Sequence, residues 1–183
     1  MITTTLRDRY EAARTFPAYL DTAHEFTDFW RALYARAKVD DQRVARAAAL
    51  DGPWHLLVLN EDWCVDAMNT LPFFARLTEG APNVSLRVLS RDANPDLMDA
   101  HLTGTSRSIP VVMILDADFE ERAWWGPRPQ PMQTWMLSPE AQSMEKADRY
   151  KELRRLYARD QGVTSMDELL TRMERVTRAA SPA

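Results

Sequence analysis

The chain has 183 residues, 45% of them hydrophobic and only five of them glycine, which is the composition of one packed globular domain. Its 23 basic and 27 acidic residues give a net charge of −4, so there is no basic excess to bind nucleic acid. No apolar run approaches the ~20 residues of a membrane span, and residues 1–15 lack the apolar segment of a signal peptide. We therefore expect neither a nucleic-acid partner nor a membrane partner.

The first third of the chain is predicted to be helical. Apolar and aromatic residues recur at three- and four-residue spacing from Pro17 to Ala37, which predicts a helix over 17–37. A second, shorter helix over 41–50 is ended by the sequence Asp51-Gly52-Pro53.

A buried strand is predicted next, because Leu56 to Leu59 form a continuous apolar run. Residues 60–62 break this run, and a helical pattern starts at Val65 and continues to about Thr78. Pro72 lies inside that pattern and is expected to kink the helix by removing one backbone hydrogen bond.

Three further strands follow. Residues 84–89 alternate between apolar and polar, which predicts a strand at a sheet edge, whereas the continuous run 111–115 predicts a central strand. Residues 119–125 should pair with 111–115 as an antiparallel hairpin. Between the edge strand and this hairpin, Asn94-Pro95-Asp96 predicts a short helix over 95–102.

The C-terminal part is predicted to hold two long helices. The first runs from Ser138-Pro139 to about Asp160 and ends at Gly162. Residues 165–168 read as a capping box that opens the second. Its apolar stripe consists of Met166, Leu169, Leu170, Met173 and Val176. A stripe of this kind must pack on the domain or on a second copy, so a homodimer through the helical extensions is one arrangement we consider.

Cys64 is the only cysteine, and it lies where the predicted strand meets the following helix. Unpaired backbone N–H groups and the dipole at the start of a helix stabilise a thiolate. Neighbouring acids oppose this effect, and arginines on nearby loops support it; these residues are Glu61, Asp62, Asp66, Arg107 and Arg128. The alternative is that Cys64 is a small buried apolar residue. A single cysteine excludes an internal disulfide and agrees with a cytoplasmic location.

Two segments carry a resemblance to the thioredoxin family: Trp63-Cys64-Val65-Asp66-Ala67, and Ser108-Ile109-Pro110 before the central strand. The resemblance implies an α/β thioredoxin-like fold with a four-stranded mixed sheet, strand order 2-1-3-4, and helices on both faces. Helical extensions at both ends complete a single thioredoxin-like domain, with the extension 1–52, the core 53–137 and the extension 138–183. It further implies a cis peptide bond before Pro110.

The chain departs from the family pattern in two places. The family has a second cysteine where this chain has Ala67, and it tends to have a buried acid where this chain has Val58. The resemblance therefore implies a monothiol-type protein, in which Cys64 is the nucleophile and an external thiol resolves the mixed disulfide. Its substrate would be a protein or low-molecular-weight thiol or disulfide.

The expected substrate site surrounds the thiol. The resemblance implies that Ile109 and Pro110 form the substrate edge and that Trp63 shields the sulfur. Trp125 could wall a groove or pack in the core, and Arg128, held between two prolines, could contact an anion or lie in solvent. Arg107 completes the predicted substrate-binding set.

Two functions of different classes are compatible with these observations. One is a thiol–disulfide oxidoreductase with Cys64 as its catalytic residue. The other is a redox-inactive thioredoxin-fold module that binds a peptide or a partner protein. We expect no cofactor, and no metal, because three separated histidines and one cysteine make no metal-ligand pattern.

Overall fold

The computed structural model describes residues 4–180, in which helices precede, separate and follow the strands of one sheet. The strands are β1 (Arg14–Thr15), β2 (Trp54–Asn60), β3 (Val84–Ser90), β4 (Val111–Leu115) and β5 (Glu121–Trp125). The helices are α1 (Leu6–Ala12), α2 (Phe16–Thr22), α3 (Thr27–Arg36), α4 (Asp41–Ala48), α5 (Val65–Met68), α6 (Leu71–Gly80), α7 (Pro95–Ala100), α8 (Gln130–Met136), α9 (Pro139–Ser143), α10 (Lys146–Asp160) and α11 (Val163–Ala180). Among the residues described, no helix is both long and apolar enough to cross a membrane.

The strands form one mixed sheet in the order β1-β3-β2-β4-β5. β2 and β3 are parallel, whereas the other neighbouring pairs are antiparallel. The predicted α/β fold and the order of the four main strands are confirmed. The prediction of four strands was short by one, because Arg14 and Thr15 pair with Val88 and Arg87. This two-residue strand covers backbone groups that an edge strand would otherwise leave unpaired.

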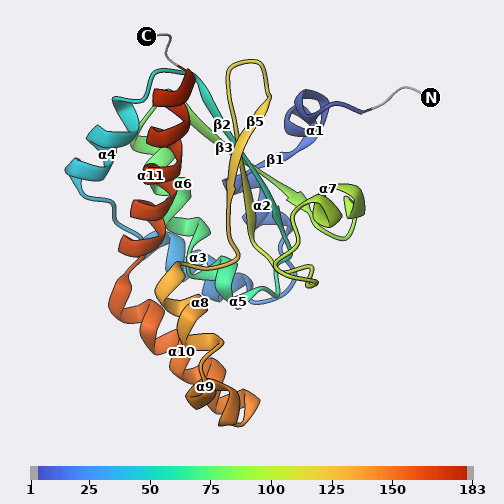
Figure 1. The fold of residues 1–183 in the computed structure, drawn as a ribbon, viewed down its shortest axis with the longest axis vertical. Helices are drawn as coiled ribbons and strands as arrows, with labels where there is room; N and C mark the ends of the chain where they lie inside the picture. Colours follow the sequence, from blue (N-terminus) through green and yellow to red (C-terminus); the bar gives the residue numbers. More distant parts are fainter. Residues whose placement is uncertain (1–3, 181–183) are drawn as a thin grey trace.

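Helices cover both faces of the sheet. In Figure 1, α4, α6 and α11 lie to one side of the strands, and α1 and α7 lie to the other. Val58, Val112 and Trp125 stand side by side across β2, β4 and β5, and Trp125 packs edge-on against Phe74 of α6. On the opposite face, His55 stacks on Phe119. The central strands β2 and β4 are almost wholly buried, as their continuous apolar sequences predict.

The helix predicted over 17–37 is two helices, α2 and α3. Between α2 and α3, Phe26 has a left-handed backbone conformation, with φ of 55°, which interrupts the helical conformation. The Asp62 carboxylate accepts hydrogen bonds from the backbone N–H groups of His24 and Glu25, at 2.8 and 3.1 Å. The break between the two helices is therefore stabilised by Asp62, which lies 38 residues from His24 in the sequence.

The helix predicted over 65–78 is also interrupted, as α5 and α6. The helix is interrupted before Pro72, whereas the sequence predicted a kink at Pro72. Proline has no N–H to donate to the carbonyl of Met68, and its ring crowds that carbonyl. Thr70 donates its hydroxyl to the carbonyl of Asp66 at 2.9 Å and stabilises the end of α5. Pro72 then takes a place in the first turn of α6, where the missing N–H does no harm.

The C-terminal region differs from its prediction in three ways. α8 was not predicted, and the helix expected from Pro139 to Asp160 is divided into α9 and α10 by an extended residue, Met144. The prediction of a capping box over 165–168 was wrong, because Ser165 is buried inside α11 and does not precede the helix. The carboxylate of Asp160 instead accepts from the N–H of Thr164 at 3.2 Å. Gly162 ends the preceding helix region as predicted, with φ of 76°.

α11 packs on the domain, as its apolar stripe predicts. Four residues of the stripe are buried in the main core: Met166, Leu169, Leu170 and Met173. Val176 is partly buried beside them. Two charged contacts further fix α11, since Asp167 pairs with Arg43 and with Arg46 of α4.

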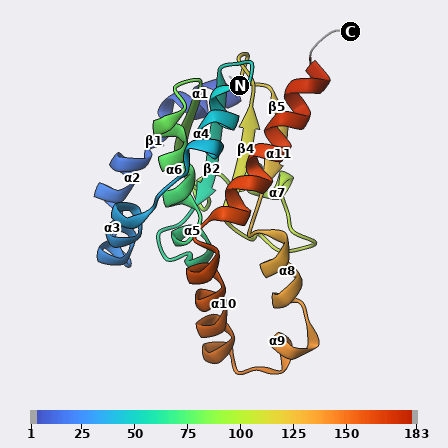
Figure 2. The same cartoon turned by 90° about the vertical axis from the view of Figure 1, so that its left-hand side faces the viewer.

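Helices α8, α9 and α10, residues 130–160, form a helical arm that projects beyond the end of the sheet, as Figures 1 and 2 show. The arm has a small core of its own, made by Met132, Met136, Leu153 and Tyr157. Leu137 of the arm is 68% exposed. The homodimer through the helical extensions stays a prediction.

Candidate functional site at the Cys64 turn

Cys64 lies between β2 and α5, as the sequence predicts. It is the N-cap residue of α5, with an extended backbone. Its own N–H bonds to the carbonyl of Glu61 at 3.1 Å, and its carbonyl accepts from Met68 at 3.0 Å, so the turn that holds the thiol is closed at both ends. The peptide bond between Ile109 and Pro110, on the loop opposite, is cis, in agreement with the resemblance.

The thiol itself is buried. Cys64 is only 5% exposed, and its Sγ donates a hydrogen bond to the carbonyl of Ile109 at 3.3 Å. The side chains of Ile109 and Pro110 are buried as well. The resemblance implies that this backbone pairs with an extended substrate strand, which stays a prediction; in this structure the carbonyl accepts a hydrogen bond from the thiol of the protein itself.

The surroundings of Cys64 hold it in the protonated form. Burial, followed by the negative charge of Asp66, raises the pKa of the thiol to about 12. Backbone N–H groups of Ala67 and Asp66 and the charge of Arg128 act in the opposite direction and are outweighed. The stabilising helix start predicted from the sequence is present, but desolvation of the thiolate is the larger effect.

Two of the three acids near Cys64 are engaged elsewhere. Glu61 accepts hydrogen bonds from the hydroxyl of Ser90 and the N–H of Asp92, at 2.8 and 2.9 Å. Asp62 holds the segment between α2 and α3, as described above, and its carbonyl accepts from the indole of Trp30 at 2.8 Å. Asp66 is thus the acid whose charge acts on the thiol.

Asp66 belongs to a buried network that joins α5 to the helical arm. Its carboxylate accepts two hydrogen bonds from Arg128, at 3.1 and 2.6 Å, and one from the hydroxyl of Tyr157, at 2.7 Å. Arg128 also donates to the amide oxygen of Gln133 at 2.8 Å. Arg128 is among the residues predicted from the sequence, whereas Tyr157 was not predicted, because it lies 91 residues from Asp66 and carries no local signal.

Burial and charge fix the protonation of Arg128 and Tyr157. Burial alone would lower the pKa of Arg128, but its hydrogen bonds and ion pair with Asp66 outweigh that effect and raise it. Burial, together with the charge of Asp66, raises the pKa of Tyr157 well above its usual value. The guanidinium stays charged and the phenol stays a hydrogen-bond donor at neutral pH. One interpretation of the sequence was that Arg128 contacts an anion. Arg128 does so, but the anion is the Asp66 carboxylate of the same chain.

A glycine lets the Arg128 loop approach the cis-proline loop. Gly126 has φ of 137°, and a Cβ at this position would lie 2.1 Å from the carbonyl oxygen of Pro110. The next peptide bond, between Gly126 and Pro127, is also cis, which the sequence analysis did not predict.

The remaining predicted substrate residues are spread over different surroundings. Trp125 is 1% exposed, and its indole N–H donates to Glu168 at 2.9 Å, so it occupies the core, one of the two alternatives for this side chain. Arg107 points to the surface and pairs with Asp99 at 2.7 Å. Trp63 remains 41% exposed beside the thiol turn. The roles assigned to these residues in substrate binding stay predictions.

A hollow of about 350 Å³ is lined in part by Arg91. The other lining residues are Asp92, Pro95, Met98 and Arg107. The guanidinium of Arg91 lies 5.0 Å from the centre of the Trp63 ring and donates to the carbonyl of Arg107 at 3.2 Å. Arg91 therefore links the exposed ring of Trp63 to this hollow.

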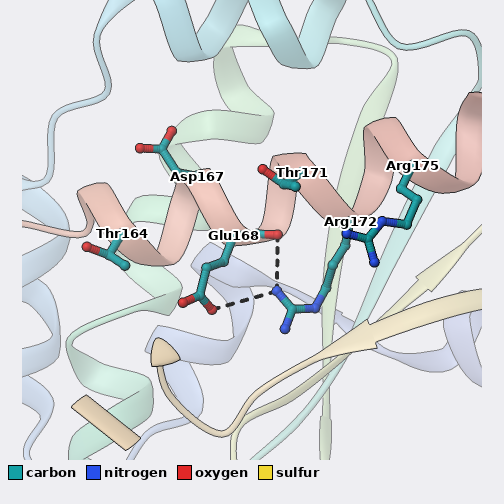
Figure 3. Close-up of a pocket in the computed structure, with 6 residues that line it drawn as sticks. All are labelled: Thr164, Asp167, Glu168, Thr171, Arg172 and Arg175. Atoms are coloured by element: carbon teal, nitrogen blue, oxygen red, sulfur yellow. Dashed lines mark hydrogen bonds and ion pairs between the residues drawn. The ribbon is translucent and has the colours of Figure 1, made fainter. Parts of the chain in front are cut away.

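A larger hollow, of about 400 Å³, lies along α11 and away from the thiol. Figure 3 shows Arg172 and Glu168 on one side of the helix, joined by a hydrogen bond and an ion pair, with Asp167 on the other. Glu168 also accepts from the backbone of Gln130 at 2.7 Å. The acids of this hollow thus hold α11 to the rest of the fold.

The histidines serve the fold. Among residues 4–180 there is no group of three or more His, Cys, Asp or Glu side chains arranged to hold a metal. His101 is 4% exposed and bonds through one ring nitrogen to the carbonyl of Leu97, at 2.7 Å, and through the other to Glu121, at 2.8 Å. Both partners are acceptors, which favours the doubly protonated ring.

We expect this histidine to make stability depend on pH. Burial alone would lower the pKa of His101, but the hydrogen bonds to Glu121 and Leu97 outweigh it and raise the pKa above the ordinary 6.5. Its contribution is therefore complete below about pH 6.5 and is lost as pH rises through the higher folded-state value. Unfolding free energies measured from pH 5 to pH 9 should show the advantage of the wild type over His101→Gln shrinking as pH rises. A constant difference would contradict this assignment.

Comparison with known proteins agrees with the fold. The family model described as thioredoxin matches residues 13–148, so the chain belongs to the thioredoxin family. A crystal structure of a protein of unknown function from Pseudomonas aeruginosa is similar, with a TM-score of 0.76, 19% identity, and coverage of 94% of this chain and 98% of that one. An HIV epitope-scaffold (4E10) is similar with a TM-score of 0.67, 19% identity, and coverage of 93% and 98%. At this identity both show the fold alone. No curated protein matches the chain.

Proposed function

We propose that this protein is a thioredoxin-fold module that binds a segment of a partner protein, and that its thiol does no exchange chemistry in this conformation. The observation that carries the proposal is the buried Cys64 thiol, hydrogen-bonded to the carbonyl of Ile109 at 3.3 Å. Exchange requires an accessible thiolate. Burial, followed by the charge of Asp66, raises the pKa of this thiol to about 12, so the thiol stays protonated at neutral pH.

The resolving half of the family chemistry is missing too. Ala67 stands where the family has its second cysteine, and Val58 where it tends to have a buried acid; both side chains are buried in this fold. A mixed disulfide at Cys64 would have no second thiol in the chain to displace it. This absence supports a role without turnover of disulfides.

The surface we propose for the partner is the one around Trp63. This indole is 41% exposed and contacts Arg91, which lines the hollow that Arg107 also lines. A large, partly exposed aromatic ring is the kind of anchor on which binding energy concentrates. A partner segment would lay an apolar side chain against the exposed part of Trp63. A cytoplasmic setting, inferred from the single cysteine, is part of this proposal.

Native thiol modification tests the proposal. Folded wild-type protein treated with excess glutathione disulfide at pH 7.5 should show no added glutathione by intact mass, over a time in which the urea-unfolded chain is fully modified. Burial and protonation both protect the sulfur, which gives the expected result. The matched control is Ser143→Cys, which places a second thiol on the exposed tip of the arm and should take up one glutathione.

The opposite result favours the other function. Rapid uptake of glutathione by folded wild type at Cys64, at a rate comparable with that of the exposed control, would contradict the proposal that the folded protein's thiol is unreactive. The protein would then be better described as a monothiol thiol–disulfide oxidoreductase. External thiols such as glutathione would be its resolving partners.

A further inference from the structure

The helical arm meets the thioredoxin-like core at the thiol turn. Figures 1 and 2 show α10 and α8 leaving the end of the sheet where α5 lies. Tyr157 is the residue of the arm's small core that reaches α5, since its hydroxyl donates to Asp66 at 2.7 Å. Arg128, just before α8, donates two hydrogen bonds to the same carboxylate.

Two members of this junction are buried and the third is largely so. The side chain of Asp66 is 7% exposed and Tyr157 is 3% exposed, whereas the side chain of Arg128 is 14% exposed. A buried carboxylate needs its hydrogen bonds, because an unpaired buried charge is strongly destabilising. Asp66 therefore strongly favours the arrangement in which the arm stays against α5.

The junction is also close to the sulfur. Asp66 follows Cys64 by two residues, in the first turn of the same helix. The charges of Asp66 and Arg128 both act on the Cys64 pKa, and Cys64 in turn acts on that of Tyr157. Movement of the arm would therefore change the surroundings of the thiol directly.

We propose that the helical arm, together with the Arg128 loop that leads into it, is a latch on the thiol: Tyr157 and Arg128 hold Asp66, and through it the first turn of α5, in the position that buries Cys64. Releasing the arm admits solvent and small reagents to the sulfur. The latch rests on the proposed function in one respect, since it presumes that the thiol is silent in the resting fold.

The test is the rate at which folded protein is alkylated at Cys64 by iodoacetamide, followed by intact mass. Tyr157→Phe keeps the ring and removes only the hydroxyl bonded to Asp66. We expect a rate about 10- to 100-fold above wild type, the range for loss of one hydrogen bond to a charged group. Tyr157→Leu, which also removes the ring, should be at least as fast. The matched control is Tyr34→Phe, which removes a tyrosine–carboxylate contact with Glu79 on the exposed surface and should leave the rate unchanged.

Low urea concentrations distinguish latch opening from global unfolding. Local opening exposes little surface, so the rate of the Tyr157 variants should hardly change with urea well below the unfolding transition. A rate that rises steeply with urea, in parallel with global unfolding, would overturn the latch.

The other outcomes separate the two proposals. Slow alkylation of the wild type and of both Tyr157 variants would overturn the latch and would remain consistent with the proposal that the thiol is unreactive in the folded protein. Fast alkylation of the wild type would overturn the proposed function, and with it the closed state that the latch presumes.

Discussion

Arg128→Met is expected to lower the free energy of unfolding by about 3–5 kcal/mol, as urea or thermal denaturation would measure it. The substitution leaves the Asp66 carboxylate buried, with the Tyr157 hydroxyl as the remaining side-chain donor of the network. An unpaired buried charge loses its hydration without gaining an opposite charge, which is why the expected loss is large.

An exposed ion pair provides the matched control. Arg107→Met removes a similar contact with Asp99, but these side chains are 56% and 51% exposed. The loss there should stay within about 1 kcal/mol, because water solvates the remaining carboxylate. The double variant Asp66→Leu with Arg128→Met should be less destabilised than the sum of its single variants. Equal losses for Arg128→Met and Arg107→Met would contradict the buried network.

Removal of the chain after Ser138 is expected to abolish a stable fold and cause aggregation. The deletion takes away α11, whose residues Met166, Leu169, Leu170 and Met173 are each at most 1% exposed in the main core. It leaves their apolar partners on α6 and β5 facing water, and burial of such surface is the main stabilising term in a domain of this size. Light scattering and the absence of a cooperative unfolding transition are the expected observations.

Point variants test whether the loss of stability comes from removing the apolar face of α11. Leu170→Ala should cost about 2–5 kcal/mol, whereas Thr171→Ala, one residue further on the exposed side, should change stability by no more than about 0.5 kcal/mol. A truncated chain that stays monomeric and equally stable would mean that α11 does not belong to the core.

Local patterns carried most of the fold prediction. The continuous apolar runs of β2 and β4 indicate burial on both faces, whereas the alternation of β3 and the stripe of α11 indicate burial of one face; a single sequence displays all of these patterns directly. The helix breaks were harder to predict. The gap between α2 and α3 depends on Asp62, a residue from another turn, and no local pattern contains that information.

For the site, the sequence by itself determined the position of Cys64 at a strand-to-helix turn, the absence of a second thiol and, through the resemblance to thioredoxins, the cis bond at Pro110. Only the tertiary structure decided how the thiol behaves. Helix start, neighbouring charges and burial act on its pKa in opposite directions, and their balance depends on distances between residues far apart in the chain. Arg128 and Tyr157 lie 62 and 91 residues along the chain from Asp66, whose carboxylate they share, so their meeting, and the burial of Cys64 beside them, exists only after folding.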